Sequence, residues 1–240
     1  MRQLSTYIIL VISTVFFIAC GQSGNKQSIT NDNQILEQTG ELIKIDFSDT
    51  SYIYLQIYAE DTVTSDGWAI EYFVKDDSSR YNDIYIKCSK GNFTGTFCGE
   101  DLLLFRRYFI PKFVGETESF IYFSHGCATD CSALLVFSKD NTSRFKDFMP
   151  VVDYSIDFNQ VLCIAGSSYE NEDTIYELAL VDLTNDEIHK IVYSNICLSA
   201  YKLTCIDNVI FSKTQVAITT TLKESIDSEQ EITQTRIIKL

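Results

Sequence analysis

Apolar and polar residues alternate with a period of two along most of the chain from residue 41 onward. Ile43, Ile45 and Phe47, for example, alternate with Lys44 and Asp46. This period is typical of β-strands that bury one face. It predicts strands at residues 43–47, 52–58, 81–88, 120–124, 133–138, 161–166, 175–182, 187–193, 208–212, 215–222 and 233–240.

Helical patterns are weak along the sequence. No convincing amphipathic helix of ten residues can be found. Residues 101–113, which include Pro111, are ambiguous, and residues 30–39 have room for one or two helical turns. Clusters of Asp, Asn, Ser and Lys separate the strands, and Asn and Asp form turns through their own side chains. We therefore expect an all-β fold of antiparallel sheets.

A weak repeat bears on how the sheets are arranged. Tight polar turns occur at residues 139–142, 184–186 and 227–229, a spacing of about 44 residues, and a blade of a β-propeller occupies ~40–45 residues. The same spacing, extended backward, predicts turns near residues 96 and 52. We expect a small β-propeller-like repeat, with a β-sandwich as the alternative.

The first 21 residues have a separate character. Met1 and Arg2 precede an apolar run from Tyr7 to Ile18. The run is shorter than a stable membrane-spanning helix and has the length of the apolar region of a secretory signal peptide. It ends in Phe17-Ile18-Ala19-Cys20-Gly21. This segment resembles the lipobox of bacterial lipoproteins.

The resemblance implies that residues 1–19 are removed and that Cys20 carries acyl chains, which anchor the protein to a membrane. It also implies, through Gly21, the outer membrane of the bacterial cell envelope. Residues 20–40 are then a polar, flexible tether and residues 41–240 form the β-rich domain. An ordinary signal peptide that is cut nearby is the alternative.

Composition and charge exclude several classes of protein. Apolar residues make up 45% of the chain and charged residues 22%, so a sizeable core is expected and wholesale disorder is not. The formal net charge is −14, which opposes both nucleic-acid phosphates and anionic lipid headgroups. We expect no nucleic-acid partner and a membrane attachment that depends on the lipid.

The cysteines other than Cys20 predict disulfides, because export places them in an oxidising compartment. Proximity in the sequence favours the pairs Cys88–Cys98, Cys127–Cys131 and Cys197–Cys205. Cys163 lies in the apolar run 161–165 and is expected to be a buried thiol.

A metal or thiol-catalysis site is the alternative for residues 125–131, where His125, Cys127, Asp130 and Cys131 occur together. The Cys-x3-Cys spacing matches no strong zinc pattern, and His189 is far along the chain. We therefore expect a hairpin loop that is closed by a disulfide, with no metal or other cofactor.

Tyrosine is the most prominent candidate for a binding surface, with 14 copies in the chain. Tyr52, Tyr54 and Tyr58 share one face of a predicted strand, and Tyr81 and Tyr85 share a face of another. Adjoining faces would form a platform that stacks on sugars or grips a partner protein. The alternative is that these rings are covered and pair across strands inside the protein.

Signatures of catalysis are absent from the sequence, which has no phosphate-binding Gly-rich loop, Gly-x-Ser-x-Gly or His-Glu-x-x-His motif. Its Asp/Asn-rich stretches at residues 76–78, 140–142 and 170–173 fit solvated turns better than calcium sites. Paired carboxylates remain open, since the chain has 33 acidic residues. We predict a non-catalytic binding or scaffolding module for a glycan or an envelope protein; the alternative is an envelope glycan hydrolase.

Overall fold

The computed structural model describes residues 31–32, 41–49, 59–75, 83–103, 107–128, 131–140, 142–165, 176–197, 202–225 and 227–240. All strand pairs in this part are antiparallel. Its only regular helical segments are two short 3-10 turns, η2 (Arg107–Phe109) and η3 (Lys202–Cys205). The prediction of an all-β fold of antiparallel sheets is confirmed.

The described strands form four sheets that follow one another along the chain. The first sheet contains β2 (Ile43–Lys44), β3 (Thr62–Val63), β4 (Ala69–Val74), β5 (Asp83–Lys90) and β6 (Phe93–Leu103). The second contains β1 (Asn31–Asp32), β7 (Lys112–Glu116), β8 (Phe120–Ala128), β9 (Cys131–Ser138) and β10 (Phe145–Phe148). The third contains β11 (Val151–Ser155), β12 (Gln160–Ile164), β13 (Tyr176–Asp182) and β14 (Glu187–Tyr193). The fourth contains β15 (Ile206–Phe211), β16 (Gln215–Lys223) and β17 (Glu231–Lys239).

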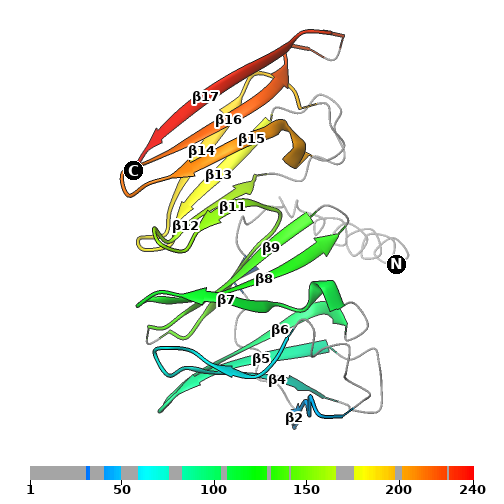
Figure 1. Cartoon of the computed structure of the whole chain (residues 1–240), viewed down its shortest axis with the longest axis vertical. Coiled ribbons are helices and arrows are strands. Elements are labelled where there is room, and N and C mark those ends of the chain that lie inside the picture. Colours follow the sequence, from blue (N-terminus) through cyan, green and yellow to red (C-terminus); the bar gives the residue numbers. More distant parts are fainter. Residues whose placement is uncertain are drawn as a thin grey trace, which may run out of the picture.

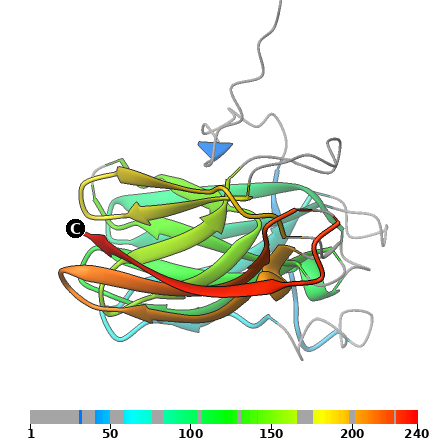
Figure 2. The same cartoon turned by 90° about the horizontal axis from the view of Figure 1, so that it is seen from above.

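The four sheets are stacked in chain order along the long axis of the molecule (Figure 1). Seen along that axis, they lie over one another with their strands running in broadly similar directions (Figure 2). Three apolar cores fill the spaces between successive sheets. The stack therefore has two inner sheets that are covered on both faces.

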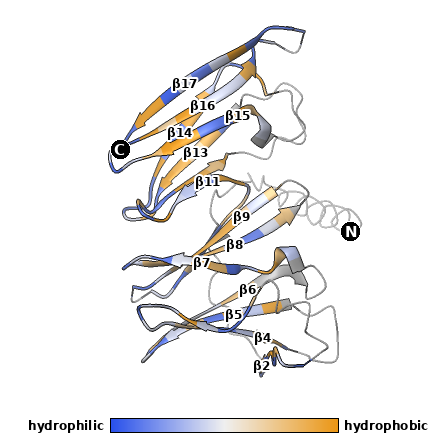
Figure 3. Ribbon diagram, viewed as in Figure 1, coloured by the Kyte–Doolittle hydropathy of each residue, from blue (hydrophilic) through white to orange (hydrophobic). Residues whose placement is uncertain are grey.

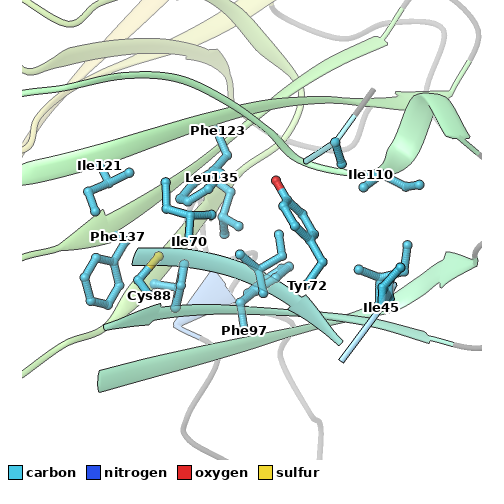
Figure 4. Packing of buried hydrophobic residues seen from close by; sticks show 14 of the residues in the cluster. Ile45, Ile70, Tyr72, Cys88, Phe97, Ile110, Ile121, Phe123, Leu135 and Phe137 are labelled. Atoms are coloured by element: carbon cyan, nitrogen blue, oxygen red, sulfur yellow. The ribbon is translucent and has the colours of Figure 1, made fainter. Parts of the chain in front are cut away.

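Strand β9 shows how an inner sheet contributes to two cores. Leu135 and Phe137 point into the first core, between the first and second sheets, where they meet residues of β4 and β5 (Figure 4). Leu134 and Val136 point into the second core, between the second and third sheets. A strand covered on both faces reads as a continuous apolar run, because successive side chains point to opposite faces and both are buried.

Predicted strands from residue 120 onward agree with the structure in position, because their edges are marked by polar turns. Strands β4, β6, β7, β10 and β11 were not predicted. The ambiguous residues 101–113 divide between the end of β6, the η2 turn and the start of β7. The described part of this segment is therefore mostly not helical: it contains the ends of two strands and one short 3-10 turn.

Two residues of the N-terminal segment belong to the second sheet. Asn31 and Asp32 form β1 and pair with Asp147 and Lys146 of β10. These two residues therefore form a short edge strand and not the helical turn for which residues 30–39 have room, and the tether of residues 20–40 stays a prediction.

The turns of the predicted repeat are not all equivalent in the structure: position 96 lies inside β6, and position 52 lies outside the described residues. The β9–β10 and β13–β14 turns, at residues 139–144 and 183–186, lie at the same end of the stack as the β5–β6 turn at residues 91–92. We call this the hairpin end. The β16–β17 turn at residues 224–230 lies at the opposite end, which also carries the disulfides and which we call the disulfide end. The turn near residue 228 is therefore not equivalent to the other two.

Gly95 of β6 allows the first two sheets to approach closely. A Cβ atom at this position would lie 2.5 Å from Cε2 of Phe137 and 2.5 Å from the backbone oxygen of Ser143. Ser143 is in the β9–β10 turn, so its backbone is held by that hairpin. Only glycine leaves enough room there for the hairpin of the second sheet.

Candidate functional site

Two of the three predicted disulfides are present. Cys127 and Cys131 close the β8–β9 turn with their Cα atoms 5.2 Å apart, and Cys197 and Cys205 close the segment before β15 at 5.9 Å. Both separations are usual for disulfides. Cys163 is the expected buried thiol, and burial raises its pKa to about 12.

The predicted bridge between Cys88 and Cys98 is not formed. The register of β5 and β6 places Gly95 opposite Cys88 and Tyr85 opposite Cys98. An offset of three residues puts the two sulfurs on opposite faces of the sheet and about 10 Å apart along it, which a disulfide does not span. Cys88 instead fills the first core, where burial raises its pKa. The short spacing between Cys88 and Cys98 in the sequence indicated that they are close, but it did not indicate the register of β5 and β6.

His125 is a structural residue in this fold. Its Nδ1 lies 2.9 Å from the carbonyl oxygen of Gly126, and its Nε2 lies 3.2 Å from a carboxylate oxygen of Asp147. The neighbouring Cys127 and Cys131 form a disulfide with each other, so neither offers a free thiol to a metal. Within the described ranges, no three His, Cys, Asp or Glu side chains gather as a metal site. The hairpin closed by a disulfide is the better interpretation of this segment.

Tyr85 is the one residue of the predicted tyrosine platform that lies among the described residues, and it is buried. Tyr85 is 2% exposed, and the ammonium of Lys75 lies 5.3 Å from the centre of its ring. The prediction of an exposed ring is wrong at Tyr85, because the ring is buried in the first sheet. Tyr52, Tyr54, Tyr58 and Tyr81 lie outside the described residues, as does Cys20.

A concave surface lies where the second and third sheets meet at the hairpin end. It is a groove of about 720 Å³ between the β9–β10 turn and the β13–β14 turn. Phe120, Val136, Val181 and Leu183 form its apolar floor. All four belong to the second core, so the groove is an opening at the edge of that core.

The rim of the groove is charged and mixed in sign. Lys146 of β10 forms an ion pair with Asp186 of the β13–β14 turn and so links the two sheets. Arg144 is exposed beside this pair, and no described side chain pairs with its guanidinium group. Ile188 of β14 lines the third-sheet side and is 43% exposed. The rim therefore offers an unpaired cation and an exposed apolar side chain.

Two similar turns frame the groove. The carboxylate of Asp140 accepts hydrogen bonds from the backbone N–H of Thr142, at 2.8 Å, and from its hydroxyl. Asp182 makes the same two bonds with Thr184, at 2.8 and 2.6 Å. The Thr142 hydroxyl is the main cause of the lowered pKa of Asp140. These carboxylates shape turns, which supports the interpretation of residues 140–142 as a solvated turn.

A buried ionic cluster fixes the position of the β9–β10 turn. Lys139 Nζ donates to Asp66, Glu116 and the carbonyl oxygen of Thr117, each at 2.6 Å. Glu116 also accepts bonds from Ser65 and from the backbone of Asp66. Burial alone would raise the pKa of Glu116, but these donors outweigh it and bring the pKa to about 2. We call this set the Lys139 clasp; it joins the β3–β4 turn to the second sheet.

Sequence reasoning located the two turns but missed the groove between them. The spacing of the turns at residues 139–142 and 184–186 was the available signal, because turns one sheet apart lie side by side in a stack. The floor of the groove forms only because the second and third sheets stack on each other. A local sequence pattern does not predict how two sheets stack.

In the part of the chain that the structure describes, no helix is long and apolar enough to cross a membrane. No protein-family description, no curated protein and no solved structure matches the chain.

Proposed function

We propose that this protein is a lipid-anchored, non-catalytic binding module of the bacterial cell envelope, attached to the outer membrane through Cys20.

 The resemblance of residues 17–21 to a lipobox supports the anchor and the outer-membrane location. The two disulfides support export, because such bonds persist in oxidising compartments. The groove between the second and third sheets is the observation that carries the binding role.

The occupant that we propose for the groove is an extended peptide segment of another envelope protein. An apolar floor takes alternate apolar side chains of an extended chain, and the exposed guanidinium of Arg144 pairs with an acidic residue. β14 is the edge strand of the third sheet, so its backbone is placed to pair with an added strand beside Ile188. A groove of about 720 Å³ has the size of common ligand sites.

A glycan is a weaker candidate for the groove. Sugars are commonly bound by exposed aromatic faces, and Phe120, the one aromatic residue in the lining, is only 9% exposed. The mixed charges of the rim also suit a polypeptide better than a neutral sugar. We therefore place the peptide first and treat glycan binding as an outcome of the test.

The hydrolase alternative has no observation in its favour. A glycosidase needs a carboxylic acid whose pKa is raised, so that it is protonated when it acts. Among the described residues, the carboxyl groups with shifted pKa values are Asp46, Glu116 and Asp140, and all three pKa values are lowered. Hydrogen bonds to the ionised form dominate each of these shifts.

For the architecture, we propose an open, propeller-like arc in which each sheet is one blade. The consecutive strand orders β7–β8–β9–β10 and β11–β12–β13–β14 support this proposal, as does the presence of three cores in place of the single core of a two-sheet sandwich. X-ray scattering in solution tests it. An open arc gives a distance distribution with a long tail, and a compact, symmetric distribution would contradict it.

The anchor is tested by mass spectrometry of the protein purified from its own membranes. We expect a chain that begins at Cys20 and carries the mass of several acyl chains. A chain that retains residues 1–19, or that carries an unmodified thiol at Cys20, would contradict the anchor without affecting the groove.

The groove is tested with a library of displayed decapeptides and, separately, with soluble peptidoglycan fragments. We expect selected peptides that alternate apolar and acidic residues, with dissociation constants of about 1–100 µM. Ile188→Asp and Arg144→Glu should each weaken their binding at least tenfold. Val63→Asp is the matched control, because Val63 is 69% exposed and lies in the first sheet. Selection of peptides that bind Ile188→Asp as well as the unaltered protein, or of glycan alone, would refute the proposed occupant.

A further inference from the structure

The fourth sheet ends in an edge strand that no other described strand covers. β17 pairs with β16 on one side only, and Figure 1 shows it at the end of the long axis of the stack. Its nine residues pair with β16 without a register shift, whereas β7, β11 and β15 all contain one. A long, regular edge without proline or a bulge is a template for pairing with another strand.

The direction of the backbone groups identifies which residues face this open edge. In an antiparallel ladder, the N–H and C=O groups of successive residues point alternately to the two sides of the strand. Leu240 donates its N–H to Thr214, on the β16 side, so the even-numbered residues of β17 point toward β16. The odd-numbered residues point to the open edge: Glu231, Thr233, Thr235, Ile237 and Lys239.

The sequence of β17 is complementary to itself when it is reversed about Thr235. In that register Glu231 lies opposite Lys239 of a second copy, Thr233 opposite Ile237, and Thr235 opposite itself. All of these residues point to the edge, so each opposed pair exchanges two backbone hydrogen bonds. Centring the pairing on Arg236 instead leaves Glu231 opposite no residue of β17, and centring it on Gln234 places Lys239 opposite Glu229, which lies outside the strand.

The side chains between these positions also match. Ile232 and Ile238 are opposed, and so are Gln234 and Arg236. These four residues are only half-buried and point toward the third sheet, where Arg236 donates to the carbonyl oxygen of Val192 at 2.7 Å. Figure 3 shows that hydrophobic and hydrophilic stretches alternate along β17.

We propose that two copies of this protein associate through β17, which forms an antiparallel, two-fold symmetric pair centred on Thr235. The two fourth sheets then become one continuous sheet of six strands, three from each copy. Such an interface uses the same patch on both copies, as expected of a two-fold dimer. It is independent of the groove and of the lipid anchor.

Cysteine cross-linking of the lipidated protein in detergent tests both the dimer and its register. In the proposed pair, the Cα atoms of the two copies of residue 235 lie about 5.5 Å apart, within the span of a disulfide. Thr235→Cys should therefore give a disulfide-linked dimer on mild oxidation. Thr233→Cys is the matched control, because the two copies of residue 233 are separated by about 13 Å along the strands.

A dimer from Thr235→Cys and none from Thr233→Cys supports the proposal, with the unaltered protein as the background. Equal cross-linking of both variants indicates random collision and overturns it. A Thr235→Cys protein that remains monomeric overturns it as well.

Charge exchange provides a second test that needs no added cysteine. Glu231→Lys and Lys239→Glu should each weaken the dimer about tenfold in sedimentation equilibrium, because each places like charges at two symmetric positions. The double variant restores opposite charges and should recover most of the affinity. Failure of the double variant to recover, when both single variants weaken the dimer, would contradict the register, and a protein that is monomeric throughout would refute the dimer.

Discussion

The second sheet is covered on both faces, but the two interfaces differ in how they are filled. Toward the first sheet, the ring of Phe137 lies 5.2 Å from that of Trp68 and 4.8 Å from that of Phe145. Toward the third sheet, Phe120 and smaller aliphatic side chains reach the edge and leave the groove open. Aromatic rings therefore pack against one another in the first interface around Phe137, whereas the second interface has an open groove at its edge.

Polar contacts increase this difference. The Lys139 clasp joins the first two sheets through the bond from Lys139, whose side chain is 5% exposed, to Asp66 and through the bonds from Ser65 and the Asp66 backbone to Glu116. The second and third sheets are joined across the groove by the Lys146–Asp186 pair, in which the Asp186 side chain is 67% exposed. The first interface is thus more extensively closed, and the second keeps the accessible surface that the proposed binding role requires.

The largest expected effect comes from removing a ring of the sealed interface. Phe137→Ala should lower the free energy of unfolding by about 3–5 kcal/mol, because the surrounding rings cannot close the cavity. Phe120→Ala should cost about half as much, since one side of that ring already borders the groove. Urea unfolding followed by the fluorescence of Trp68, the only tryptophan, measures both. Equal losses would contradict the contrast between the interfaces.

Removal of the clasp should have the next largest effect. Lys139→Met should cost about 3 kcal/mol at pH 7, because it leaves the buried carboxylate of Glu116 without its cation. The folded pKa of Glu116, about 2, lies below its ordinary value of 4.5. Its contribution to stability is therefore present above pH 4.5 and is lost as the pH falls toward 2.

Urea unfolding across this pH range measures the contribution of the clasp. The unaltered protein should lose more stability than Lys139→Met between pH 4.5 and 2. Parallel pH profiles of the two proteins would show that Lys139 does not hold Glu116 in its ionised form.

Substitution of one glycine at each interface compares how tightly the two interfaces are packed. Gly95→Ala should cost about 2 kcal/mol, because its Cβ would meet the fixed backbone oxygen of Ser143. Gly115 of β7 lies toward the third sheet, and its Cβ would lie 2.9 Å from the Cδ1 atom of Ile156. The end of that flexible side chain can move, so Gly115→Ala should cost clearly less. The reverse order in thermal unfolding would contradict the difference in packing.

The smallest expected effect is at the exposed pair across the groove. Lys146→Met should change the free energy of unfolding by less than about 1 kcal/mol, because ion pairs in contact with solvent contribute little. It should nevertheless change peptide binding in the groove, since the pair crosses its rim. Calorimetric titration with a selected decapeptide measures the second effect, and a large loss of stability would show that the pair is structural.

The positions of many strands could be predicted from the sequence, but the register between strands and the stacking of the sheets could not. Period-two patterns located β8, β9 and β12 to β17, because each has apolar residues on at least one face and polar turns at its ends. The same reasoning failed for β6, which begins with small and polar residues such as Thr94 and Gly95 and packs through close backbone approach.

Register and stacking account for the errors at the candidate site. Cys88 and Cys98 were paired by proximity, but the register of β5 and β6 turns them to opposite faces. Tyr85 was placed on the surface because its strand alternates, yet it is buried. In both cases the strand itself, β5, was predicted correctly. The error arose because the register of the neighbouring strand, or the sheet packed above, determines which side chains meet and which are exposed.

Site-specific photo-cross-linking in intact cells tests the central claim most directly. A photoreactive benzoyl-phenylalanine at position 188, where Ile188 is 43% exposed, faces the groove, and one at position 63, where Val63 is 69% exposed, lies on the first sheet. The account predicts a discrete cross-linked product with another envelope polypeptide from position 188, lost in Arg144→Glu, and none from position 63. The same products from both positions, or no product from position 188, would contradict the groove as the binding site.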